Sequence, residues 1–92
     1  DELKVLAPAT AIFYSTPSPS EPEYVSVGDE IAVDHTLCQL EAMKIFSPLS
    51  LADFNTDGDL DDPSKRYQVT RINMSNGQQV NVGDLLFVVK PV

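Results

Sequence analysis

The stretch Thr36–Leu51, TLCQLEAMKIFSPLSL, contains two apolar runs separated by Glu41-Ala42-Met43-Lys44. Two such runs on either side of a short connection predict a β-hairpin. A tight hairpin turn favours Gly, Asn or Asp, because its central residues take positive φ. This tip offers Ala, Met and Lys instead. A turn that departs from the local preference is a candidate functional site, and Lys44 is its reactive group.

The rest of the chain also predicts strands. Runs of Val, Ile and aromatic residues occur at 3–6, 11–14, 24–27, 31–33, 67–74 and 85–89, without a sustained helical period. The alternation slips between Val69 and Ile72, which predicts a bulge. Pro48 cannot donate to a sheet ladder, so its strand is expected at a sheet edge or bulged. Leu85–Val89 is apolar throughout and is expected to be buried on both faces or to lie at the seam between the sheets.

A weak internal repeat divides the chain. Four positions recur 49 residues later as similar residues: Gly28, Ile31, Val33 and Leu37 become Gly77, Val80, Val82 and Leu86. Neither copy of so small a β unit can bury a core alone, but two copies packed together can. Ninety-two residues allow one domain with one small core. We therefore expect a single all-β domain over 1–92, a flattened antiparallel barrel or sandwich with a quasi-two-fold axis.

Composition excludes some classes of protein. The net charge of −8 argues against a nucleic-acid partner. No run of 18 apolar residues is present, so no membrane span is expected. The chain opens without a signal-peptide pattern, and its single cysteine, Cys38, cannot form an internal disulfide. A first residue of Asp rather than Met predicts a fragment or a processed chain. We expect a cytoplasmic protein, with a plastid as the other compartment that fits.

Residues 15–22 form a segment rich in proline and serine. Proline fixes φ and removes a backbone donor, so this segment predicts an ordered but irregular loop. Composition alone favours a surface linker.

The tip Glu41-Ala42-Met43-Lys44 resembles the modification hairpin of biotinyl domains, in which the lysine amine carries biotin. Phe13-Tyr14 with the following Ser-Thr-Pro-Ser-Pro run is similar to the "thumb" of the biotin carboxyl carrier proteins of acetyl-CoA carboxylase. Val27-Gly28-Asp29 and Asp34–Cys38 continue that pattern. The resemblance covers about residues 3–52 and 67–90.

This resemblance implies a fold of two four-stranded sheets with the lysine turn protruding at one end. It also implies that biotin is attached to Lys44 by a biotin protein ligase and then carries carboxyl groups between a biotin carboxylase and a carboxyltransferase. The domain itself would be a carrier and not a catalyst. The residues expected to contact the ligase or the cofactor are Glu41, Ala42 and Met43 at the hairpin (41–45), and Thr16, Pro17, Ser18 and Pro19 in the thumb-like loop (15–23).

An acidic insertion at 53–66 departs from the family pattern. Asp53, Asn55, Asp57 and Gly58 have the spacing of an EF-hand calcium loop, with Asp59 offering its carbonyl and Asp61 a water-mediated contact. The twelfth position is Ser64 rather than the bidentate Glu. The alternatives are a weak calcium site and a solvated acidic loop that binds nothing.

Two alternatives to the biotin carrier remain from the sequence. A lipoyl carrier has the same fold and a lysine at the same tip, but Asp usually precedes that lysine and the proline-rich thumb is absent. The second alternative is a calcium-stabilised interaction module that kept the fold without modification.

Overall fold

The computed structural model describes residues 2–53 and 65–92. These residues form eight strands and one short 3-10 helix, η1 (Leu51–Asp53): β1 (Leu3–Leu6), β2 (Ala11–Tyr14), β3 (Glu30–Ala32), β4 (Thr36–Ala42), β5 (Ile45–Ser50), β6 (Arg66–Ile72), β7 (Gln78–Val80) and β8 (Leu85–Pro91). Within this part of the chain, no helix is both long and apolar enough to cross a membrane.

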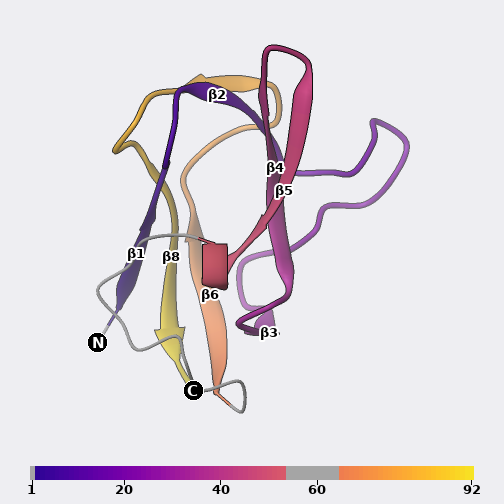
Figure 1. The fold of residues 1–92 in the computed structure, drawn as a ribbon. Coiled ribbons are helices and arrows are strands. Elements are labelled where there is room, and N and C mark those ends of the chain that lie inside the picture. The colour runs from indigo at the N-terminus through magenta and orange to yellow at the C-terminus, as the bar shows by residue number, and fades with distance from the viewer. Residues whose placement is uncertain (1, 54–64) are drawn as a thin grey trace.

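The strands form two four-stranded antiparallel sheets. The first sheet has the order β1-β8-β6-β3 and the second has the order β5-β4-β2-β7. The β4–β5 hairpin projects beyond the body of the barrel, at the end opposite the start of β1 and the end of β8 (Figure 1). The predicted all-β, two-sheet architecture is therefore confirmed, with the Lys44 hairpin at one end.

Two backbone turns, one in each copy of the predicted repeat, have the same structure. Asp29 N donates to Ser26 O and Gln78 N donates to Ser75 O, each at 3.0 Å, and these pairs are separated by the predicted 49 residues. The glycines inside the two turns, Gly28 and Gly77, have φ of 99° and 84°, a left-handed conformation that glycine adopts without steric cost. The repeat read from the sequence is thus a repeat of structure.

One predicted strand is absent. Residues 24–27 form no strand, and β3 begins only at Glu30. Tyr24 N donates to Ser15 O at 2.9 Å, which closes the base of the preceding loop instead of adding to a sheet. The tight turn at Ser26–Asp29 then redirects the chain, because its positive-φ glycine is incompatible with extended pairing.

The core fills the space between the two sheets. Phe13 of β2 and Phe87 of β8 meet across it, with ring centroids 5.8 Å apart. Residues 86–89 are all buried and Leu85 is partly buried, so the predicted burial of Leu85–Val89 on both faces is confirmed from Leu86 onward. The β6–β8 register shifts between Val69 and Arg71, which confirms the bulge, and β5 lies at a sheet edge, where Pro48 removes no ladder bond that the sheet needs.

Truncating the core side chain of Leu86 tests this packing. Leu86 is fully buried, so Leu86→Ala is expected to lower the free energy of unfolding by about 2–5 kcal/mol, from lost burial and the cavity that remains. Urea denaturation measures the change. Val82→Ala is the control, because Val82 is 68 % exposed and its truncation should cost less than about 0.5 kcal/mol. Equal losses in the two variants would contradict the assigned core.

Candidate functional site

The hairpin tip is a two-residue turn. Ala42 pairs with Ile45, which leaves Met43 and Lys44 as the only residues between the paired strands. Their φ angles are 52° and 67°, so both central residues are left-handed, as a type I′ turn requires. The sequence argument that this turn breaks local preference is therefore borne out. Non-glycine residues in this region each carry a conformational cost of roughly 1–3 kcal/mol, which the strand pairing on either side must offset.

The tip is exposed and largely apolar apart from the lysine. Met43 is 94 % exposed, Ile45 is 68 % exposed, and Ala42 and Lys44 are also exposed. Because no element within residues 2–53 and 65–92 covers the turn, the Lys44 amine is accessible to solvent and to a modifying enzyme. The structure thus places three of the predicted hairpin residues, Ala42, Met43 and Lys44, on one accessible surface.

A side-chain cluster braces the base of the tip on the outer face of the second sheet. The Tyr14 hydroxyl donates to Glu41 Oε1 at 3.0 Å, and the Tyr14 ring contacts the Phe46 ring with centroids 5.8 Å apart. Glu41 and Phe46 are directly opposite each other on β4 and β5. The hydrogen bond to Glu41, then burial, then the Glu41 charge raise the pKa of Tyr14, so the phenol stays protonated at neutral pH. The cluster therefore joins three adjacent strands below the tip.

The thumb-like loop, residues 15–23, lies beside the hairpin between β2 and β3 (Figure 1). Its base is pinned by Ser15, whose backbone N–H donates to Asn76 Oδ1 at 2.9 Å and whose carbonyl accepts from Tyr24 N at 2.9 Å. Within the loop, Glu21 N donates to Ser18 O at 3.1 Å. The loop is thus irregular but held in place, as its proline content predicts.

A pocket of about 270 Å³ opens between this loop and the hairpin. It is lined by residues from four segments: Tyr14, Thr16, Pro17, Ser18, Pro19, Gln39, Phe46 and Asn76. Its volume is slightly below the roughly 300 Å³ at the low end for drug-sized ligands, so it suits a small ring system. Phe46 at its wall is two residues from Lys44, about 7 Å along a strand. A group on the Lys44 arm can therefore reach it.

The four predicted thumb residues, Thr16 to Pro19, all line this pocket, and Glu41 reaches it through Tyr14. Ala42 and Met43 are at the tip and outside it. Sequence reasoning did not assign Gln39, Phe46 or Asn76 to the site. A sequence signal for Phe46 was available. It is an aromatic residue two positions after the lysine, and the alternation of side chains along the strand places it on the outer face of the sheet. Asn76 comes from the other copy of the repeat, and no local pattern points to it.

The predicted calcium ligands Asn55, Asp57, Asp59 and Asp61 lie outside the described residues, so calcium binding stays a prediction. Asp53 is described, and its Oδ2 accepts from Ser50 N at 2.9 Å and from Ser50 Oγ at 3.1 Å. This carboxylate is already engaged in closing the turn after β5. Within residues 2–53 and 65–92, no group of three or more His, Cys, Asp or Glu side chains is arranged to hold a metal ion.

Cys38 and His35 have structural roles. Cys38 is fully buried on β4, and burial raises the pKa of its thiol to about 12. His35 is exposed in the turn before β4, where its Nε2 lies 3.2 Å from Tyr24 O. Cys38 is therefore a core residue, and His35 is a solvent-exposed turn residue.

Replacing the lysine at the tip should stabilise the fold while removing its reactive group. Glycine adopts positive φ without the Cβ clash, so Lys44→Gly is expected to raise the free energy of unfolding by about 0.5–1 kcal/mol. Urea denaturation checks this. Gly77→Ala is the matched reverse change at a φ of 84°, and it should lower stability by about 1 kcal/mol. A less stable Lys44→Gly protein would contradict the assigned turn.

The Cys38 thiol should be unreactive in the folded domain. With a pKa raised from 9.0 to about 12, it is protonated at pH 8, and burial also blocks access. Iodoacetamide is expected to alkylate it only after unfolding in urea, as followed by intact mass. Above pH 9 the unfolded thiol ionises while the buried one does not, so this group makes stability fall as the pH rises toward 12. Rapid alkylation of the native protein would contradict this placement.

Comparison with known proteins finds similarity to biotin carboxyl carrier proteins of acetyl-CoA carboxylase. No protein-family model matches the chain. The chain is 33 % identical over 88 residues to the biotin carboxyl carrier protein of acetyl-CoA carboxylase of Nostoc sp., covering 96 % of this chain and 42 % of that protein. It is 31 % identical over 87 residues to the chloroplastic biotin carboxyl carrier protein 1 of Arabidopsis thaliana, covering 95 % of this chain and 27 % of that protein.

A third relative is the biotin carboxyl carrier protein of Chlamydia trachomatis, which is 28 % identical over 83 residues, or 90 % of this chain and 43 % of that protein. The chain therefore spans less than half the length of these curated relatives. The similarity covers both strands of the Lys44 hairpin and the loop beside it. The chain has the fold of a biotinyl domain and resembles the biotin carboxyl carrier proteins of acetyl-CoA carboxylase over almost its whole length.

Proposed function

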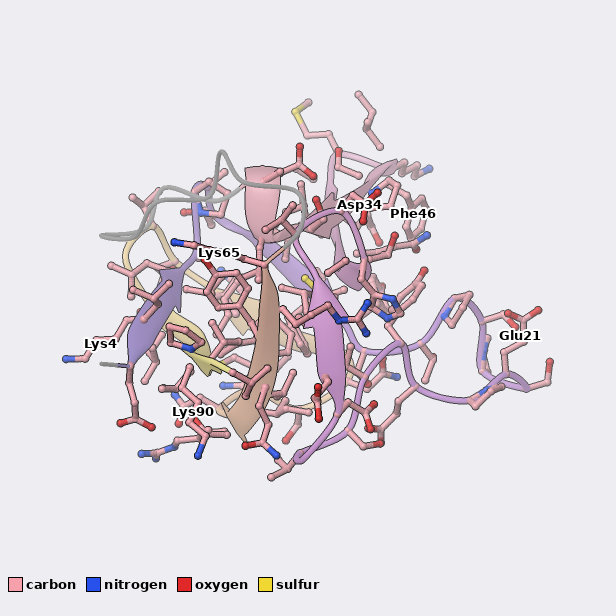
Figure 2. The ribbon with its side chains drawn as sticks, turned by 90° about the horizontal axis from the view of Figure 1, so that it is seen from below. Lys4, Glu21, Asp34, Phe46, Lys65 and Lys90 are labelled. Carbon is pink, nitrogen blue, oxygen red and sulfur yellow. The ribbon has the colours of Figure 1, made fainter. Side chains whose placement is uncertain are left out.

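We propose that this domain is a biotin carrier, with biotin attached through an amide bond to Lys44. The observation that carries the proposal is the position of Lys44 in an exposed, left-handed two-residue turn. The chain has three other lysines: Lys4 in β1, Lys65 immediately before β6, and Lys90 in β8. All three belong to the first sheet or its approach, away from Phe46 and the hairpin (Figure 2).

The chemistry at Lys44 is acyl transfer to a primary amine. The deprotonated amine attacks the carbonyl carbon of an acyl adenylate, which a biotin protein ligase supplies. The bond to AMP breaks, AMP leaves, the nitrogen loses a proton, and the product is an uncharged amide. The net charge of the chain then changes from −8 to −9. When bound, biotin supplies the nitrogen that carries a carboxyl group. The chain's own residues present the amine, brace the hairpin and shelter the attached ring.

Shelter comes from the pocket beside the tip. Phe46 and Tyr14 offer aromatic surface, while Thr16 and Ser18 offer hydroxyls that hydrogen-bond a neutral ring. The arm formed by lysine and the biotin chain is on the order of 10 Å long or more, counted in single-bond steps. This length exceeds the roughly 7 Å between Lys44 and Phe46 along the strand. The ring can therefore rest in the pocket or extend into a partner enzyme.

The assembly that this carrier serves follows by analogy with the named relatives. We propose a biotin carboxylase and a carboxyltransferase as its two partners, within an acetyl-CoA carboxylase. The domain contributes attachment and positioning and does not catalyse carboxyl transfer itself. A lipoyl carrier is the runner-up, and it is disfavoured by Met43 before the lysine and by the proline-rich loop that lines the pocket.

Modification of Lys44 is tested with biotin protein ligase, biotin and ATP. The chain is expected to gain one biotinyl group by intact mass, located on Lys44 by peptide mapping. Lys44→Arg keeps the positive charge but lacks a transferable primary amine, so labelling should fall to background while the circular dichroism spectrum is unchanged.

Two controls make the result specific. Lys90→Arg should still be labelled fully, because Lys90 lies on β8 of the first sheet. Incubation with a lipoate ligase and lipoate tests the runner-up. Labelling that persists in Lys44→Arg, or lipoylation in preference to biotinylation, would overturn the proposed function.

A further inference from the structure

We propose that the pocket beside Lys44 holds the uncharged ring of the attached cofactor and rejects the same ring once it carries a carboxylate. This inference rests on the proposed function and extends it, because it makes carboxylation itself the signal that releases the ring toward a partner. The argument depends on which charges surround the pocket.

The pocket wall offers no positive charge. Its polar groups are the hydroxyls of Thr16 and Ser18 and the amides of Gln39 and Asn76, and the remaining lining residues are aromatic or proline. Neutral donors and acceptors of this kind suit a cyclic urea, which has one carbonyl and N–H groups. A carboxylate placed here would lose water without gaining a cationic partner, which is unfavourable.

A negative charge lies directly behind one residue of the pocket wall. Glu41 Oε1 accepts the Tyr14 hydroxyl proton at 3.0 Å, and Tyr14 lines the pocket. A phenol has a single donor hydrogen, so this bond commits the Tyr14 proton to Glu41 and withholds it from a bound anion. A second carboxylate in the pocket would be repelled by Glu41 across a partly buried space, where screening is weaker than in bulk water.

The wider charge distribution adds to this repulsion. The thumb-like loop contains Glu21 and Glu23 and no basic residue. Apart from Lys44, every Lys and Arg of the chain lies in the first sheet or immediately before β6: Lys4, Lys65, Arg66, Arg71 and Lys90. Figure 2 shows Glu21 and Phe46 on the side away from Lys4, Lys65 and Lys90. Lys44 itself loses its charge when its amine becomes an amide, and no Lys, Arg or His is among the residues that line the pocket.

A pocket that binds one form of a tethered ring more tightly than the other changes the fraction of time that each form spends in the pocket. The uncharged ring would spend more time against Tyr14 and Phe46, and the carboxylated ring would spend more time extended and available. This switch needs no conformational change of the protein, because the added charge alone changes the equilibrium between the bound and extended positions of the ring.

The test uses small soluble probes and the Lys44→Gln chain, whose uncharged side-chain amide reproduces the loss of charge at residue 44. 2-Imidazolidinone is an uncharged cyclic urea, and 2-oxoimidazolidine-4-carboxylate is the same ring with a stable negative charge. Each is titrated to tens of millimolar while amide resonances are followed by NMR, a range that extends beyond the roughly millimolar effective concentration of a tethered ring. The neutral probe is expected to shift Thr16, Ser18 and Gln39, with an affinity about tenfold or more above that of the anion.

Three variants separate the effect of charge from the effect of shape. Gln39→Lys adds a cation at the pocket and should bring the anionic probe to at least the affinity of the neutral one. Ser47→Lys adds the same charge to β5 next to Phe46 but on the opposite face, since strand residues alternate, and should leave the preference unchanged. Glu41→Gln should reduce the preference by removing the Glu41 charge while keeping an oxygen for the Tyr14 hydroxyl.

Equal affinities for the two probes, or no saturable shift with the neutral probe, would overturn this inference. An unchanged preference in Gln39→Lys would do so as well. These outcomes are independent of Lys44 modification, because the probes bind a chain in which residue 44 is a glutamine that cannot be modified. If Lys44 accepts biotin but the pocket binds the neutral and anionic probes equally well, the proposed carrier function is supported and the proposed charge switch is wrong.

Discussion

The antiparallel pairing of Ala42 with Ile45 is the constraint on which the functional end of this protein depends. This register leaves two residues to reverse the chain, and only a left-handed turn does so with the twist of the strands. Met43 and Lys44 have little intrinsic preference for that conformation. They adopt it because β4 is fixed on its other side by β2, with Phe13 opposite Leu40 and buried in the core. The core between the sheets thus holds the lysine at the tip.

The same pairing builds the pocket. Side chains alternate along each strand, so fixing Leu40 and Phe13 inward directs Gln39, Glu41, Tyr14 and Phe46 to the outer face. The Tyr14–Glu41 hydrogen bond and the Tyr14–Phe46 contact then join three strands below the tip. The thumb-like loop covers this face because Ser15 is tied to Asn76 at its base. The pocket walls are therefore consequences of strand register together with one loop anchor.

Charge and apolar surface are segregated in the molecule. The Lys and Arg residues other than Lys44 lie in the first sheet or immediately before β6, while the hairpin and its loop present acidic and apolar side chains. For the carrier proposed above, this segregation would give the end that partner enzymes approach a uniform electrostatic character. Lys44 is the one Lys or Arg at that end, and conversion of its amine to an amide would remove its charge.

The sequence by itself determined the hairpin, the position of the candidate lysine, the edge placement of Pro48, the bulge near Thr70 and the repeat across 49 residues. These features are set by local chemistry: alternation, a missing proline donor and glycine at positive φ. Only the tertiary structure decided that residues 24–27 form no strand, that Tyr14 binds Glu41, and that Asn76 anchors the loop. Ser15 and Asn76 are 61 residues apart. Contacts of this kind depend on how the two sheets pack, and no local pattern encodes them.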